Sequence, residues 1–239
     1  MLNNDRILYF SDKETNDAII AIQNKSVTVA NITNNTEEGR GYLLNLINEA
    51  NILSVDHFWI PQYTANLPAA LSDILSRLPI SHIYLPTPMN ERESYLLLSI
   101  ENVLEGFRCT YSCFSEEQTF EIEDMLVYQS YRPPIEEGCR VIFSLKFHQK
   151  YYTYIAHGAI AEDNTDLANL AMSASHTVIF GCRGRSYRDT YYLEEISPNT
   201  KVIIIQTDDI EVSEEAYLTS KDQTSFYYKL QDAKIAEEE

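Results

Sequence analysis

Three arginines lie close together in the stretch GCRGRSYRD, in the last quarter of the chain. Arg183, Arg185 and Arg188 fall within six positions. A guanidinium group can donate two parallel hydrogen bonds to one phosphate, so this spacing favours a loop that binds a nucleotide or a DNA backbone without cleaving it. The simpler interpretation is that the arginines pair with acidic side chains on a solvated surface, where ion pairs contribute little. The sequence leaves both interpretations open.

A nucleophile beside a base would be a second kind of chemistry. His157 with Cys182 is the one pairing to consider, and a lone histidine next to an apolar strand is more often a hydrogen-bonded structural residue. The GxSxG, GxxxxGK[ST] and GxGxxG motifs are absent from the sequence. A Ser- or Cys-based mechanism therefore has no positive support. The cysteines show no CxxC spacing and are expected to be structural thiols: Cys109, Cys113, Cys139 and Cys182.

Tyrosines flank the same region of the chain. Their rings could stack on the exposed bases of single-stranded DNA. Half-buried positions on strands explain them equally well. They are Tyr151, Tyr152, Tyr154, Tyr187, Tyr191 and Tyr192.

The first half of the chain, which must position these groups, alternates between strands and helices. Short β-branched and apolar segments predict strands at residues 6–11, 18–23, 25–30, 58–60 and 82–85. Apolar residues at helical spacing predict helices over residues 37–52, 67–78 and 91–104. The pattern is typical of an α/β protein built from strand–helix repeats.

The second half is richer in strands. A strand-rich pattern covers residues 107–147, and further strands are predicted at residues 151–157, 177–181, 201–206 and, as an edge strand, 225–230. One more helix is predicted over residues 163–174.

Residues 56–71, DHFWIPQYTANLPAAL, are the stretch around which the rest is organised. They predict a buried strand, a polar loop after Pro61, and a helix that Asn66 is expected to cap. Without gaps, they resemble the core of a metallo-β-lactamase-fold hydrolase, in particular the soluble domain of the ComEC family of DNA-uptake proteins. There, a segment such as DALVLTHPHADHIGGL leads into a helix and a vYLP strand. This chain has Ile-Tyr-Leu-Pro at residues 83–86 in the same order.

The resemblance implies a metal site whose ligands are missing here. The HxHxDH residues of the family bind zinc or manganese, and their positions carry neutral or apolar side chains that cannot replace imidazole or carboxylate. The resemblance places the bridging aspartate on a glycine and the late histidine on a cysteine or on Arg183. We therefore expect no metal, no cofactor and no catalytic residue. The vestigial positions are Gln62, Thr64, Asn66, Leu67, Gly158 and Cys182.

The fold implied by the resemblance is a four-layer αβ/βα sandwich of the α/β class. We expect a single domain over residues 1–230, followed by an acidic tail over residues 231–239. Gln62, Thr64, Asn66, Gly158 and Cys182 should then converge in one shallow cleft between two sheets.

The net charge of the chain limits the partners that it can bind. The chain has 18 Lys and Arg residues against 36 Asp and Glu, a net charge of −18, which disfavours nucleic acid without excluding a local basic patch. No apolar run is long enough to cross a bilayer, and the N-terminus lacks a signal-peptide pattern, so we expect a soluble chain. It would be cytoplasmic if free-standing, or outside the cytoplasmic membrane if it is an excised ComEC-type domain.

The predicted function follows from the resemblance and from the missing ligands. We expect a non-catalytic scaffold or partner-binding domain in DNA uptake, with a protein partner or the membrane-embedded competence channel. One alternative is a phosphate or single-strand binder that uses Arg183, Arg185 and Arg188. The other is a metal-dependent nuclease or phosphodiesterase with a relocated site.

Overall fold

The computed structural model describes residues 5–12, 17–30, 37–114, 119–129, 141–155, 170–181, 200–205, 217–220 and 225–231. The chain forms two compact units, and each is described by itself. Unit 1 comprises Met1–Ser115 and Ser225–Glu239, and unit 2 comprises Glu116–Thr224. The expected single domain over residues 1–230 stays a prediction.

Unit 1 is built on a seven-stranded sheet with the order β14-β1-β2-β3-β4-β5-β6. The strands are β1 (Arg6–Asp12), β2 (Asp17–Gln23), β3 (Ser26–Ala30), β4 (Val55–Trp59), β5 (Ile80–Leu85), β6 (Thr110–Cys113) and β14 (Ser225–Gln231). The neighbouring pairs from β3 to β6 are parallel, whereas β1 pairs antiparallel with β2 and β14. The loops after β4 and β5 therefore leave the sheet at the same edge.

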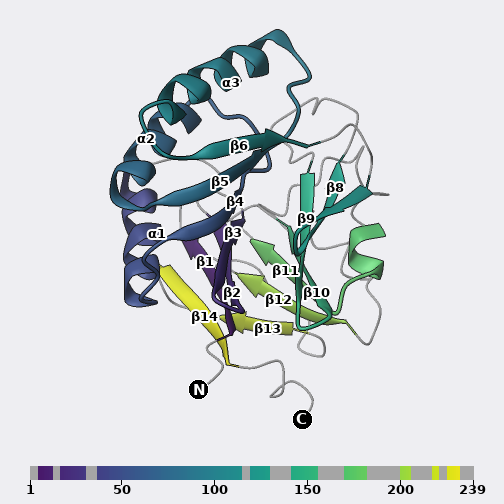
Figure 1. The fold of residues 1–239 in the computed structure, drawn as a ribbon. Helices are drawn as coiled ribbons and strands as arrows, with labels where there is room; N and C mark the ends of the chain where they lie inside the picture. The colour runs from purple at the N-terminus through teal and green to yellow at the C-terminus, as the bar shows by residue number, and fades with distance from the viewer. Residues whose placement is uncertain are drawn as a thin grey trace. The chain divides into compact units, whose positions relative to one another are not determined.

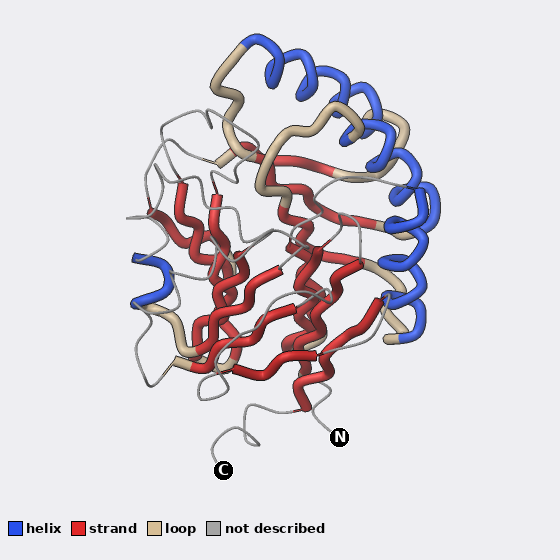
Figure 2. The backbone as a smooth tube through the Cα atoms, turned by 180° about the vertical axis from the view of Figure 1, so that it is seen from behind, coloured by secondary structure: helices blue, strands red, loops and turns tan. Residues whose placement is uncertain are grey.

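Three helices connect the parallel strands of unit 1 and lie along one face of its sheet (Figures 1 and 2). They are α1 (Glu37–Glu49), α2 (Leu67–Arg77) and α3 (Glu91–Leu104). Helix α2 packs against both α1 and α3. Coverage by helices on this face explains why alternate residues of the strands point into one apolar layer.

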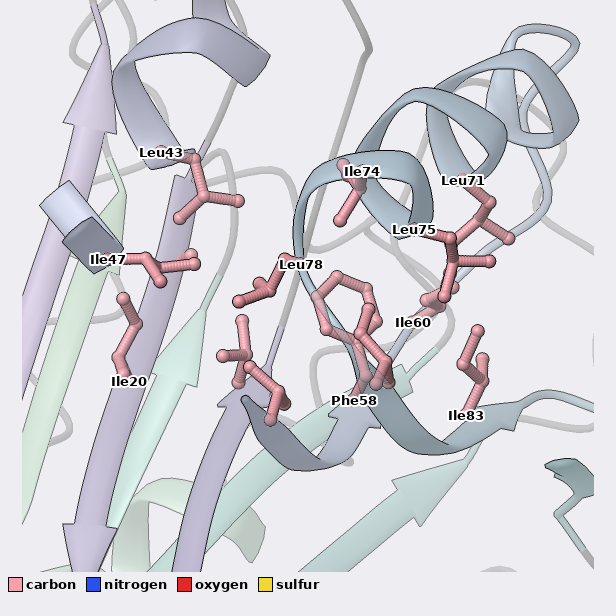
Figure 3. Packing of buried hydrophobic residues seen from close by; sticks show 14 of the residues in the cluster. Ile20, Leu43, Ile47, Phe58, Ile60, Leu71, Ile74, Leu75, Leu78 and Ile83 are labelled. Carbon is pink, nitrogen blue, oxygen red and sulfur yellow. The ribbon is translucent and has the colours of Figure 1, made fainter. Parts of the chain in front are cut away.

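The core of unit 1 lies between these helices and the sheet (Figure 3). Phe58 and Ile60 come from the strand β4 and the residue after it, and both are fully buried. Leu71 and Ile74 of α2 point toward the sheet from the other side of the layer. Burying side chains of this size contributes about 1.5–3 kcal/mol each, so this layer carries much of the unit's stability.

Unit 2 contains the second seven-stranded sheet, with the order β13-β12-β11-β10-β9-β8-β7. Its strands are β7 (Thr119–Ile122), β8 (Met125–Gln129), β9 (Val141–Phe147), β10 (Lys150–Ile155), β11 (Thr177–Gly181), β12 (Lys201–Ile205) and β13 (Tyr217–Ser220). Three buried hydroxyls, Ser144, Thr153 and Ser175, form a chain of hydrogen bonds that ends on the carbonyl of Ala171. Burying these polar groups is tolerated because they satisfy one another.

Most predicted elements are confirmed, with shifted ends. The central strand is Val55–Trp59, so it begins three residues earlier than expected and ends one residue earlier. Pro61, two residues past its end, has no N–H to continue the ladder. The predicted edge strand is β14, which lies at the edge of its sheet and extends to Gln231, one residue into the expected tail. Strand β13 was not predicted. Of the expected helix over residues 163–174, only residues 170–174 are described, and residues 170–173 are helical.

No helix in the described part of the chain combines the length and the apolar character needed to cross a membrane.

Candidate functional site

The loop between β4 and α2 carries three of the positions at which the resemblance places metal ligands, Gln62, Thr64 and Asn66, and Leu67 begins α2 directly after it. Its start is fixed by the N–H of Ile60, which donates to the carbonyl of Tyr84 at 3.0 Å. Its middle is fixed by Tyr63, whose hydroxyl donates to the carbonyl of Pro86 at 2.7 Å. The N–H of Leu67 closes the loop on the carbonyl of Thr64 at 3.1 Å. The loop is thus held by hydrogen bonds and packing within the chain.

The donor set of this loop does not fit a hydrolytic metal ion. Gln62 and Asn66 offer neutral amides and Thr64 a hydroxyl, which are poor ligands for zinc. Leu67 is only 1% exposed and belongs to the core. Within the described ranges, no three His, Cys, Asp or Glu side chains come close enough together to hold a metal.

The remaining predicted site residues lie outside the described part of the chain. They are Gly158, Cys182, Arg183, Arg185 and Arg188, together with His157, Tyr187, Tyr191 and Tyr192. The predicted convergence on one cleft and the arginine loop therefore stay predictions.

Asn66 occupies the N-cap position of α2, as predicted, but its side chain makes no capping hydrogen bond. Its backbone is helical, with φ −90° and ψ −5°, whereas a capping residue needs an extended conformation to aim its oxygen at the first turn. Asn90 shows the difference at the start of α3. It has φ −149° and ψ 171°, and its side chain accepts from the N–H of Glu93 at 2.9 Å.

Two tyrosines proposed as stacking surfaces are core residues. Tyr152 and Tyr154 of β10 are only 6% and 3% exposed, and Phe147 packs edge-on against Tyr152. They are not available to stack on nucleic-acid bases, whereas Tyr151 is half-buried. The interpretation as strand residues is correct for Tyr152 and Tyr154.

The thiols described in unit 1 are poor nucleophiles. Cys109 and Cys113 are both free and half-buried. Burial raises the pKa of the Cys109 thiol to about 11. Burial also raises the pKa of Cys113, although a hydrogen bond with Tyr63 opposes the shift. Both thiols stay protonated at neutral pH, which fits a structural role.

A hydrogen-bonded group on β5 and β6 was not found from the sequence. His82 Nδ1 lies 2.7 Å from Thr110 Oγ1, and His82 Nε2 lies 2.9 Å from Ser112 Oγ. Ser112 is thirty positions from His82 in sequence. Only the parallel pairing of β5 with β6, which aligns His82 with Thr110, brings the three side chains together. No local motif could have signalled this group.

The exposed face of α3 is the second surface feature of unit 1. Tyr95 and Leu98 are 65% and 54% exposed. They line, with Leu97, a shallow hollow of about 360 Å³ that is bordered by Glu91 and Glu101. Exposed apolar side chains rimmed by charge are typical of surfaces that contact other molecules.

Comparisons with known proteins give a fold and no sequence family. No protein-family model matches the chain, and a search of curated proteins finds no relative. Among solved structures, the chain is similar to the metallo-β-lactamase fold protein YhfI from Bacillus subtilis, with a TM-score of 0.53 and 7% identity, over 94% of this chain and 99% of that one. The metallo-β-lactamase MIM-2 is also similar, with a TM-score of 0.48 and 9% identity, over 78% of this chain and 77% of that one. The metallo-β-lactamase GOB-18 from Elizabethkingia meningoseptica has a TM-score of 0.44 and 10% identity, over 76% of this chain and 82% of that one.

The likeness to YhfI is an argument about architecture alone, because 7% identity carries no information on activity. It spans nearly the whole of both chains and agrees with the mixed sheets and the helices described above. The α/β class predicted from the sequence is confirmed, and the chain has the metallo-β-lactamase fold.

Proposed function

We propose that this chain is a metallo-β-lactamase-fold domain that works by binding a partner and not by metal-dependent hydrolysis. The observation that carries the proposal is the loop between β4 and α2. Its residues at the family's ligand positions are amides, a hydroxyl and Leu67, a buried core residue. A hydrolytic zinc needs three or more protein ligands with imidazole, thiolate or carboxylate donors.

The resemblance to ComEC-type domains supplies the process, which is DNA uptake. In that setting, a domain without the metal would act as a scaffold for another protein or for the membrane-embedded competence channel. The exposed face of α3 supports a binding role, since Tyr95 and Leu98 offer apolar area beside Glu91 and Glu101. Such a surface suits a partner with apolar side chains flanked by basic ones.

Metal retention tests the first half of the proposal. The purified chain is incubated with excess zinc or manganese, desalted and analysed for bound metal, beside a metallo-β-lactamase treated in the same way. We expect less than about a tenth of an equivalent to remain, because an intact hydrolytic site holds metal tightly. Near-stoichiometric retention would contradict the proposal and favour a hydrolase with a relocated site.

Binding through α3 tests the second half. The chain is mixed with vesicles that contain a reconstituted ComEC-type channel and with empty vesicles, and bound protein is measured by flotation. We expect binding to the channel vesicles that Leu98→Asp weakens at least about tenfold, since it puts a charge into the apolar contact. Leu170→Asp is the matched control, because Leu170 is also exposed, at 49%, but lies in unit 2. Equal loss in both variants, or no binding, would count against this surface.

A further inference from the structure

We propose that Ser112 is a nucleophile activated by His82, forming a reactive site for acyl esters that is separate from the vestigial metal loop. This inference goes beyond the binding role and does not depend on it. The elements that carry it are the parallel strands β5 and β6, whose pairing places Tyr84 opposite Ser112 and His82 opposite Thr110. Thr110 and Ser112 lie two positions apart on one strand and therefore on one face of the sheet.

The hydrogen bonds fix which nitrogen of His82 can act as a base. A threonine hydroxyl has one proton, and Thr110 Oγ1 donates it to the carbonyl of Ser81 at 3.1 Å. Thr110 must then accept at its short contact of 2.7 Å with His82 Nδ1, which places a proton on that nitrogen. In the neutral ring, Nε2 is left with a lone pair. Ser112 donates its hydroxyl proton to this lone pair across 2.9 Å.

This arrangement has the relations expected of a nucleophile, a base and a group that orients the base. The distance between Ser112 Oγ and His82 Nε2 lies within the range of about 2.6–3.2 Å over which a base can take a proton. Thr110 has the orienting role. The ring of His82 also packs against the ring of Tyr84, with centroids 4.5 Å apart, so its position is fixed from a second side.

The site is open to a reactant. Ser112 and Thr110 are exposed, and β6 is the last strand in the order of its sheet. The N–H of Phe114 donates to the carbonyl of Leu85 at 2.8 Å, toward β5. Since N–H groups alternate along a strand, the N–H of Cys113 points away from β5. It lies directly after Ser112, where a donor could stabilise the negative oxygen formed on an attacked carbonyl.

The reaction balances with an ester and water as its two reactants. Ser112 Oγ forms a bond to the acyl carbon of an ester while His82 Nε2 takes the hydroxyl proton. The bond from the acyl carbon to the leaving oxygen breaks, and His82 returns the proton to that oxygen. Water then attacks the acyl-serine with His82 again as the base, which regenerates the free hydroxyl.

A fluorophosphonate probe tests the site on the intact chain. Ser112 Oγ would bond to phosphorus as fluoride leaves and the proton passes to His82 and then to water. We expect a stable adduct on the peptide that contains Ser112, detected by mass spectrometry, and none in Ser112→Ala. His82→Gln, which cannot take the proton, should slow labelling by at least about 100-fold. The control is Ser76→Ala, because Ser76 is exposed but donates only to the carbonyl of Asp73.

The positioning role of Thr110 has its own readout. Thr110→Val should slow labelling because it removes the acceptor for His82 Nδ1, and Thr110→Ser should restore it, since the hydroxyl returns. Near-native circular dichroism in each variant separates a change in reactivity from unfolding. An adduct on another residue, no adduct, equal labelling of His82→Gln and the native chain, or failure of Thr110→Ser to exceed Thr110→Val would each overturn the proposal.

Discussion

Leu71 offers a direct test of the core on which the loop and the helices depend. It lies within α2, is 0% exposed, and points toward the side of the sheet where Ile60 and Ile83 lie (Figure 3). Substituting Leu71→Ala removes its apolar contacts and leaves a space that its neighbours must fill. Those neighbours come from separate strands, so little relaxation is available to them.

The loss of stability expected for Leu71→Ala follows from the burial of Leu71 and from the cavity that the change leaves. Leucine-to-alanine changes at fully buried sites cost about 2–5 kcal/mol, and the larger values occur where the cavity cannot collapse. We expect a loss of about 3–4 kcal/mol in the free energy of unfolding of unit 1. With a urea slope of about 2–3 kcal/mol/M, the midpoint falls by about 1–2 M.

The assay is urea denaturation followed by circular dichroism and by the fluorescence of Trp59, which lies in unit 1. The matched control is Leu98→Ala in α3, because Leu98 is 54% exposed and sits in a helix of the same unit. Alanine favours a helix at least as well as leucine, so the control should cost less than about 0.5 kcal/mol. Equal midpoints for the two variants would refute the packing described for α2.

Three further predictions concern local features of unit 1. Asn66→Ala should lower the free energy of unfolding by only a few tenths of a kcal/mol and Asn90→Ala by about 1 kcal/mol, because of the two only Asn90 makes a capping bond. Equal losses in urea denaturation would contradict the cap geometry. Leu67→His, which restores a family ligand type, should destabilise by about 2–4 kcal/mol because it buries an imidazole in the core, and added zinc should not reverse the loss. The pKa of the Cys109 thiol is raised from 9.0 to about 11, so the folded chain keeps this thiol protonated over most of the range between those values. Alkylation of Cys109 at pH 9 should therefore be about 50-fold slower than in the unfolded chain. The readout is mass spectrometry of the Cys109 peptide, and equal rates would refute burial of the thiol.

The order and type of the elements could be predicted from the sequence because the apolar periods are strong in this chain. The helix over Glu91–Leu104 was predicted to the residue, since its apolar residues recur at helical spacing. Strand β13 was missed because its four residues, Tyr217–Ser220, are too few to show a period. The α/β class follows from the alternation of strands and helices, whereas the four-layer sandwich was predicted from the resemblance of residues 56–71 to a known framework.

Contacts between distant residues could not be predicted in the same way. The group of His82, Thr110 and Ser112 depends on the register of β5 against β6, and a shift of one residue would move the hydroxyls to the other face. The failed cap of Asn66 depends on a backbone angle that the loop imposes, whereas residue type alone favours capping. In both cases, tertiary structure decided between options that the residue types left open.

Contacts within the chain hold the loop between β4 and α2 in place. Metal binding contributes to folding where a site exists, since the ligands come together only in the folded state. In this chain the same loop is held by Leu67, which is buried in the core, and by the hydroxyl of Tyr63, which donates to the carbonyl of Pro86 on the loop after β5. A buried leucine contributes about 1.5–3 kcal/mol and the hydrogen bond about 1 kcal/mol. These contacts hold β4, α2 and the loop after β5 together.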